Sequence, residues 1–251
     1  MAERIQKIMS QWGIASRRQA ERMIVAGRVN LNGRTATLGD RVDLTTDILQ
    51  VDGKSIQPDS RPQLLYLLLH KPVGVVSTCH DPQQRAIVLD LLPPDLGNNT
   101  GIHPVGRLDF ASSGALILTN DGELTLGLTH PRYHLPKTYV VELNRVISRR
   151  DLDLWRSGVV LEHKKTLPAR LQLDKSDGSG KTVVIVLTEG RNRQIRRVAR
   201  LLGYRVTKLH RTAIGKLTLT NSSGAELPSG QYRHLTSTEI NFLKNSFIPN
   251  L

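Results

Sequence analysis

The chain has 251 residues, of which 39% are hydrophobic, so it can bury a core, and global disorder is excluded. Lysine and arginine number 35 against 22 acidic residues, which leaves a formal net charge of +13. Such an excess is typical of a protein whose partner is a polyanion, either a nucleic acid or an acidic membrane. The one cysteine, Cys79, excludes an internal disulfide and any zinc site built from several cysteines.

The N-terminus and the apolar runs indicate where the protein works. The first residues, MAERIQKIMSQ, lack the apolar segment of a secretory signal peptide. The longest strongly apolar run, Leu64–Leu69, is too short to span a bilayer. We therefore expect a soluble protein of the cytoplasm or of a reducing organelle stroma, and nucleic acid becomes the favoured partner.

The first sixty residues predict two helices followed by hairpins. Residues 2–10 have helical apolar periodicity, and Ser16-Arg17-Arg18-Gln19 is a capping box that opens a second helix. Asn32-Gly33 is a strong hairpin signal. Residues 1–34 carry seven Lys/Arg against two acids, whereas residues 35–60 carry two against five. The basic charge therefore lies on the helices and the first turn, where a solvated helix face is the alternative explanation.

This segment resembles the alpha-L RNA-binding motif, a helical and hairpin module of a small-subunit ribosomal protein and of some tRNA synthetases. The resemblance rests on the run Gly13–Arg18 and on the Gly-x-Val-x-x-Asn-Gly spacing of residues 27–33. It implies that a basic helix end faces structured RNA and reads its phosphates and shape, through Arg17, Arg18 and Arg22. Two prolines in the polar segment 57–63 predict a boundary between domain 1–60 and domain 61–251.

Beyond this boundary the chain mixes strand-like and helix-like patterns. The expected helices are short and cover residues 123–128, 151–157 and 194–202. The expected strands cover residues 64–69, 73–76, 115–118, 137–143, 171–173 and 182–187, with a hairpin turn at Asp177-Gly178-Ser179-Gly180 between the last two.

One acid stands out in the loop before the strand 115–118. Asp109 lies inside Gly106-Arg107-Leu108-Asp109, and the small residues 111–114 that follow would let a substrate backbone come close. A turn-capping aspartate is the ordinary explanation of such an acid, and this stretch alone favours it over catalysis.

The stretch 190–211 carries eight Lys/Arg and no acid. Its arginines begin at the N-terminus of the expected helix 194–202, where the helix dipole already favours anions. A carboxylate such as Asp109, or a phosphate, would be stabilised there. An RNA-binding helix without catalysis is the alternative.

Two other patterns carry no site. Gly180-Lys181-Thr182 would need a glycine at position 175 to form a phosphate-binding loop, and that position is Lys175. His130 and His134 are four residues apart, but nearby prolines prevent the regular helix that would bring both onto a metal ion. The sequence therefore predicts no metal site and no cofactor.

Three stretches together resemble the signature motifs of the RNA pseudouridine synthases, in the same order. They are Gly106-Arg107-Leu108-Asp109, Lys137-Thr138-Tyr139 and the run Gly190–Arg197, with Lys71-Pro72-x-Gly74 and Leu209-x-Arg211 in addition. With the N-terminal module, the whole chain is similar to the ribosomal RNA pseudouridine synthases of small-subunit type A and large-subunit types B and F. The run His130-Pro131-Arg132-Tyr133 favours large-subunit type B.

The resemblance implies roles for individual residues. Asp109 falls on the nucleophilic aspartate, Tyr139 on the tyrosine that stacks on the target uracil, and Arg196 on the basic partner of the aspartate. Arg107 falls on the arginine that fills the gap left by the flipped base, and Leu209 on the apolar wall of the base pocket. The implied substrate-binding residues are Arg107, Leu209, Arg193, Arg197 and Lys71.

The fold implied is α+β, with a small N-terminal RNA-binding domain and a catalytic domain whose mixed or antiparallel central sheet carries a cleft. The implied reaction isomerises a specific uridine of ribosomal RNA, with large-subunit RNA favoured. It breaks the N1–C1′ bond and re-forms the link through C5, without redox change. The base must leave its stack, and a carboxylate can attack C1′, attack C6 or stabilise a positive sugar centre.

The expected partner is ribosomal RNA or an assembling ribosomal subunit, with no membrane, and the protein is expected to be a monomer. The alternative function is a non-catalytic RNA-binding factor of ribosome assembly on the same fold. Asp109 with Arg196 argues against it, because a pure binder has no need of an acid facing its polyanion. A nuclease is disfavoured because no cluster of metal-binding carboxylates is evident.

Overall fold

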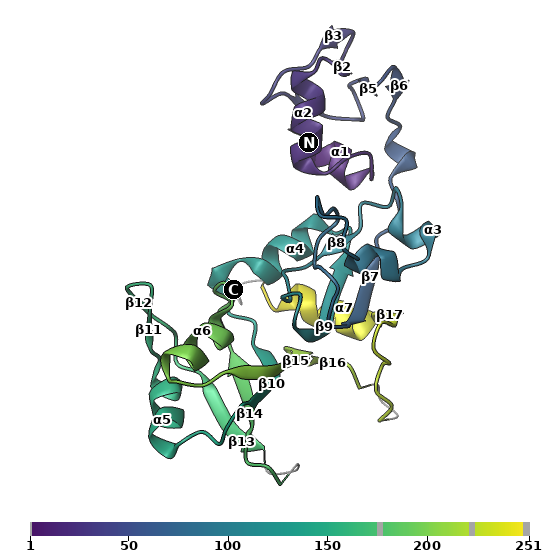
Figure 1. Ribbon diagram of the computed structural model, residues 1–251. Helices are drawn as coiled ribbons and strands as arrows, with labels where there is room; N and C mark the ends of the chain where they lie inside the picture. Colours follow the sequence, from purple (N-terminus) through teal and green to yellow (C-terminus); the bar gives the residue numbers. More distant parts are fainter. Residues whose placement is uncertain (1, 175–177, 221–223, 248–251) are drawn as a thin grey trace. The chain divides into compact units, whose positions relative to one another are not determined.

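The computed structural model describes residues 2–174, 178–220 and 224–247, and these divide into two compact units (Figure 1). The first, here the N-terminal unit, comprises Met1–Tyr66, Leu92–His103 and Thr119–Gly122. The second, here the sheet unit, comprises Leu67–Leu91, Pro104–Leu118 and Glu123–Leu251. Within the described residues, no helix is both long and apolar enough to cross a membrane.

The N-terminal unit contains two packed helices and a small sheet, as predicted. Ser16 caps the second helix, since its Oγ accepts a hydrogen bond from the backbone N–H of Gln19. Asn32 and Gly33 both have positive φ, which the predicted hairpin turn requires. The elements are β1 (Glu3–Arg4), α1 (Ile5–Gln11), α2 (Arg17–Val25), β2 (Val29–Leu31), β3 (Arg34–Thr35), β4 (Arg41–Val42), β5 (Leu49–Val51) and β6 (Lys54–Ser55).

The segment 57–63, predicted to be a linker, packs within the N-terminal unit. It contains the short 3-10 helix η1 (Pro58–Ser60), and the indole Nε1 of Trp12 donates to the carbonyl of Gln57 at 2.9 Å. The Asn120 amide donates to the carbonyls of Gln63 and Thr100, both at 2.9 Å. These contacts join later segments of the chain to the unit, including α3 (Pro94–Gly97). The division into domains 1–60 and 61–251 stays a prediction.

One large mixed sheet forms the sheet unit. In the described residues it has nine strands in the order β13-β14-β10-β15-β9-β7-β17, with β16 beside β15 and β8 beside β9. Mixed strand directions confirm the expected α+β fold, because β15 pairs parallel to β9 whereas β10 pairs antiparallel to β14 and β15. The strands are β7 (Tyr66–Lys71), β8 (His103–Pro104), β9 (Ser113–Thr119), β10 (Lys137–Leu143), β13 (Arg170–Asp174), β14 (Thr182–Leu187), β15 (Val206–Ile214), β16 (Leu217–Thr218) and β17 (Tyr232–His234).

The parallel pairing of β15 with β9, here the junction, joins the two halves of the sheet through only two residue pairs. These are His210 with Ser113 and Arg211 with Gly114. A Cβ atom on Gly114 would lie 2.2 Å from the Arg211 carbonyl oxygen, and the φ of this glycine is +116°. Glycine is therefore the one residue that lets the strands approach this closely.

Helices α5 (Arg149–Ser157) and α6 (Gln194–Leu201) cover the half of the sheet that contains β13, β14, β10 and β15 (Figure 1). Their apolar faces supply Trp155, Ile195 and Val198 to a core that includes Val183 and Ile185 of β14. Such burial is the main favourable contribution to folding. A short hairpin, β11 (Val160–Leu161) and β12 (Lys164–Lys165), follows α5.

Two expectations need correction. Residues 73–76 form no strand, because Pro72 ends β7 at Lys71. Among them only Val76 makes an isolated bridge, to Ile87. The C-terminal helix α7 (Ser237–Asn245) has no counterpart among the predicted helices, although its capping box of Thr236 and Glu239 is readable in the sequence. The remaining helices are η2 (Val88–Leu91), α4 (Gly122–Thr129) and η3 (Pro131–Tyr133). Part of the predicted turn 177–180 lies outside the described residues.

Candidate active site

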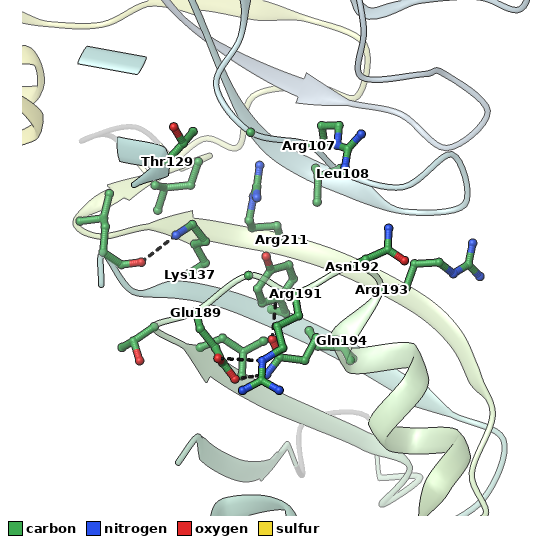
Figure 2. Close-up of a pocket in the computed structure, with 18 of the residues that line it drawn as sticks. Arg107, Leu108, Thr129, Lys137, Glu189, Arg191, Asn192, Arg193, Gln194 and Arg211 are labelled. Carbon is green, nitrogen blue, oxygen red and sulfur yellow. Dashed lines mark hydrogen bonds and ion pairs between the residues drawn. The ribbon is translucent and has the colours of Figure 1, made fainter. Parts of the chain in front are cut away.

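A cavity of about 600 Å³ lies in the sheet unit, which is within the size range of small-ligand sites (Figure 2). Its walls come from stretches far apart in the sequence, so only the fold assembles it. The lining residues include five that the sequence predicted, Arg107, Asp109, Tyr139, Arg193 and Leu209.

The carboxylate of Asp109 and the guanidinium of Arg196 form an ion pair, with Oδ2 and Nε 3.7 Å apart. The Arg196 side chain is 14% exposed and that of Asp109 is 30% exposed. Arg196 Nη2 also donates to the carbonyl of Ala111 at 2.7 Å and to Ser112 Oγ at 3.1 Å. Arg196 therefore holds the loop that contains Asp109. Its own side chain does not line the cavity.

Arg196 Nε is buried and makes no hydrogen bond within the described residues. Burial lowers the pKa of the Arg196 guanidinium, and the Asp109 carboxylate opposes that shift. A buried cation with one donor unsatisfied gains from a facing carboxylate, because its charge has lost its hydration. The predicted partner of Asp109 thus lies beside it.

Lys71, predicted to bind substrate, lies under the Asp109 loop and is fully buried. Its Nζ donates to the carbonyls of Pro72 and Ser112, both at 2.8 Å. Burial lowers the pKa of Lys71 to about 8, although the Asp109 carboxylate acts in the opposite direction. Lys71 has no exposed surface and does not line the cavity, and its contacts hold this loop. Its role in substrate binding stays a prediction.

Arg197, also predicted to bind substrate, is outside the cavity wall. Its Nη2 contacts Glu162 Oε1 at 2.6 Å, and the Glu162 side chain is 72% exposed. Neighbouring arginines of α6 therefore have different surroundings, because successive side chains of a helix point about 100° apart. Arg196 faces the loop of Asp109, and Arg197 pairs with Glu162 at the surface.

The loop that leads into α6 is held by a network of charged and amide groups (Figure 2). Arg191 Nε lies 3.1 Å from Glu189 Oε2, and Gln194 Nε2 donates to Glu189 Oε1 at 2.7 Å. Arg191 also donates to the carbonyls of Lys164 and Lys165 in the β11–β12 hairpin. Arg193 follows with φ +48°, a left-handed conformation that a side-chain-bearing residue adopts only where its surroundings impose it.

The RNA pseudouridylate synthase family matches residues 65–200 of the chain, and the S4 domain family matches residues 3–48. The chain belongs to the RNA pseudouridylate synthases. It is therefore an enzyme, an isomerase, with an S4 domain at its N-terminus. The predicted family, RNA-binding module and enzyme class are confirmed.

Relatives of this synthase match it over nearly its whole length. Ribosomal large subunit pseudouridine synthase B of Bacillus subtilis is 39% identical, over 96% of both chains. An uncharacterized RNA pseudouridine synthase of Aquifex aeolicus is 35% identical, over 96% of this chain and 93% of its own. A crystal structure of a pseudouridylate synthase superposes with a TM-score of 0.68 at 29% identity, over 96% of this chain and 99% of the other.

Two cations in the cavity wall of the synthase, Lys137 and Arg211, are not among the site residues that the sequence predicted. Arg211 is 3% exposed, donates from Nε to the carbonyl of Ala115 at 2.7 Å, and has a buried Nη2 without a partner in the described residues. Its side chain rises from β15 toward the loop of Arg107 and Leu108 (Figure 2). Both cations stand inside motifs that the sequence displays, which is the signal that could have revealed them.

We expect Lys137→Met to remove a pH dependence of stability. Burial chiefly, and Arg211 in addition, lower the pKa of Lys137 from 10.5 to about 8. Between these pH values the unfolded chain binds more protons than the folded chain, so the parent gains stability as pH rises. The free energy of unfolding of the parent, relative to Lys137→Met, should therefore increase from pH 8 to pH 10.5.

Urea unfolding of both proteins across this pH range measures the difference. Lys181→Met, at an exposed lysine of the sheet unit, is the matched control. A parent–variant difference that stays constant or falls with pH would contradict the burial of the Lys137 charge.

Proposed function

We propose that the enzyme isomerises a specific uridine of ribosomal RNA to pseudouridine, with Asp109 as nucleophile. The observation that carries this proposal is the Asp109 carboxylate in the cavity wall, backed by the Arg196 guanidinium at 3.7 Å. Large-subunit RNA is the favoured substrate, because the Bacillus subtilis relative that matches the full chain is a ribosomal large subunit pseudouridine synthase. The proposed location is the compartment where ribosomes assemble, the cytoplasm, and the proposed state is a monomer.

The target base must leave its stack to reach a carboxylate inside a cavity. Tyr139 and Leu209 line this cavity from adjacent strands, and they can hold a flipped uracil between an aromatic ring and an aliphatic side chain. Arg107 is exposed at the cavity edge, where its guanidinium can occupy the space that the base vacates. Base flipping is thus supported by residue types on two sides of one cavity.

Asp109 then has two chemically reasonable targets, C1′ of the ribose and C6 of the uracil. In either case the glycosidic bond to N1 breaks, the base turns while it stays enclosed, and C5 bonds to C1′. C5 then loses its proton and N1 takes one up, so the composition of the nucleotide is unchanged. Arg196 keeps the carboxylate oriented through the reaction, since it is itself fixed by Ala111 and Ser112. No electron is gained or lost overall, so the chemistry requires no redox group.

Cations around the acid supply the attraction for an RNA backbone. Lys137, Arg193 and Arg211 line the cavity, and the exposed Arg193 guanidinium can donate to a phosphate or a base carbonyl. In the N-terminal unit, Arg17, Arg18 and Arg22 are exposed on helix α2. We propose that they bind structured parts of the same RNA.

The alternative is a non-catalytic assembly factor. An RNA binder gains nothing from a carboxylate beside its polyanion, whereas the structure uses Arg196 and Lys71 to hold the loop of Asp109 in one place. This arrangement favours the enzyme. Mapping pseudouridine in ribosomal RNA from cells with and without the gene separates the two, since an assembly factor leaves the modification pattern unchanged.

We expect Asp109→Asn to lower the rate of pseudouridine formation at least about a thousandfold, the scale of losing a nucleophile. RNA affinity should stay within about twofold, because the change removes a negative charge from a cation-rich cavity. Single-turnover assays and filter binding on the same RNA measure the two effects. Asp153→Asn, at an exposed acid of α5, is the control. A variant with the parental rate would rule out Asp109 as the nucleophile.

We expect Arg196→Met to lower the single-turnover rate at saturating enzyme about a hundredfold, because it leaves Asp109 without its buried partner. Arg197→Met should cost less than about fivefold, as is usual for a surface ion pair. Arg196→Lys should rescue only part of the loss, since an ammonium cannot reach Asp109, Ala111 and Ser112 together. Equal losses at positions 196 and 197 would mean that helix α6 only holds RNA.

We expect replacement of Arg17, Arg18 and Arg22 by Gln to lower the slope of log affinity against log salt concentration by roughly two to three units. The matched control replaces the same number of arginines in the same unit, at Arg28, Arg34 and Arg41. Two of these already pair with acids, Arg28 with Asp52 and Arg34 with Asp40. Equal changes in both triple variants would show that the attraction is diffuse and not centred on helix α2.

A further inference from the structure

A cluster of metal-binding side chains lies in the sheet unit apart from the residues that line the cavity. His70, His210 and Glu226 each offer one ligand atom, and these atoms all lie within 4.8 Å of one another. His70 is on β7 and His210 is on β15, while Glu226 follows β16, where its backbone bridges Thr220. The strand β9 separates β7 from β15 in the sheet, so the cluster spans the junction.

The cluster faces away from the cavity. Leu209 and Arg211 line the cavity, and His210 stands between them on the same strand. Successive side chains of a strand point to opposite faces of the sheet, so His210 projects from the other face. Ser112, which lines the cavity, lies just before β9, whereas Ser113, the first residue of β9, contacts His210.

The hydrogen bonds of both histidines leave a ring nitrogen available. His70 Nδ1 lies 2.7 Å from the carbonyl oxygen of Leu227, which can only accept, so Nδ1 carries the proton and Nε2 the lone pair. His210 Nδ1 lies 2.9 Å from Ser113 Oγ, which can accept in the same way. Metal-bound histidines have this arrangement, in which one nitrogen donates to an oxygen and the other binds the ion.

The surroundings keep the rings suited to binding a cation. His70 is buried, and the rings of His70 and His210 are 5.2 Å apart. Two imidazoles with one carboxylate form the His₂Glu donor set that zinc takes in proteins.

We propose that His70, His210 and Glu226 bind a divalent transition-metal ion, best fitted by Zn²⁺, on the face of the sheet opposite the cavity. Ligand atoms of tetrahedral zinc lie about 3.3 Å apart, so side-chain shifts of roughly 1.5 Å complete the site, with water as fourth ligand. The ion ties β7 to β15 across β9. Its role is structural, because it reinforces a junction of only two residue pairs.

The test uses the full-length protein with Cys79→Ser, which removes the one thiol that would bind zinc by itself. Isothermal titration with Zn²⁺ should give one equivalent per chain, and Co²⁺ should give the strong visible absorption of a four-coordinate N/O site. Glu226→Gln and His210→Gln should each weaken Zn²⁺ binding at least about tenfold. Ser113→Ala should weaken it by a smaller factor, because Ser113 only orients His210.

His234→Gln, at an exposed histidine of β17, is the matched control and should bind Zn²⁺ like the parent. Zn²⁺ should raise the melting temperature of the parent and the control but not of Glu226→Gln, whose exposed position makes it the variant least at risk of misfolding. Equal Zn²⁺ affinity in the parent, Glu226→Gln and His210→Gln would overturn the proposal. Binding of less than one equivalent of Zn²⁺ per chain would also overturn it, because the three residues would then form only a hydrogen-bonded cluster without metal.

Discussion

The structure depends on the close contact of β15 with β9 at Gly114. Two parallel residue pairs join the halves of the sheet, and a side chain at this glycine would overlap the Arg211 carbonyl. The pairing sets how far β15, which carries Leu209 and Arg211, lies from the loop of Asp109. Two short pairs contribute little by themselves, so other interactions must hold the junction.

Buried cations provide these interactions. Lys71 donates to the carbonyl of Ser112, Arg196 to the carbonyl of Ala111, and Arg211 to the carbonyl of Ala115. Each cation has lost water on burial, and carbonyl oxygens replace part of that hydration. Three long side chains from different parts of the chain therefore end on residues 111–115, where the loop of Asp109 runs into β9, and the position of the candidate nucleophile follows from them.

A second set of cations, which shares only Arg211 with the first, lines the cavity itself. Lys137, Arg193 and Arg211 outnumber the two acids of the cavity wall, Asp109 and Glu189. The field in the cavity is therefore positive, while the Asp109 carboxylate lies opposite Arg196. On the opposite face of the junction lie two histidines and a carboxylate, those of His70, His210 and Glu226. Strand alternation on β15 places Leu209 and Arg211 in the cavity and His210 on the other face, so one strand serves two chemically distinct environments.

Much of the fold could be predicted from the sequence, because caps, turns and apolar periods are written in adjacent residues. Ser16 caps α2, Asn32-Gly33 turns a hairpin, and residues 137–143 form the strand expected there. Where proline interrupts such a pattern, as after Lys71, the expected strand 73–76 is absent. The resemblance to the family motifs likewise implied Asp109, Tyr139 and Leu209, which the fold brings into one cavity wall.

The surroundings of the charged residues were decided by the tertiary structure. Arg196 and Arg197 are equivalent in the sequence, yet one reaches Asp109, 87 positions away, and the other a surface glutamate. From the sequence, the charge of Lys71 would be expected at the surface. The fold buries it, and Nζ donates to the carbonyl of Ser112, 41 positions further along the chain. His210 meets Ser113 across 97 positions. Such pairs depend on strand register and helix rotation, which arise only when distant segments pack together.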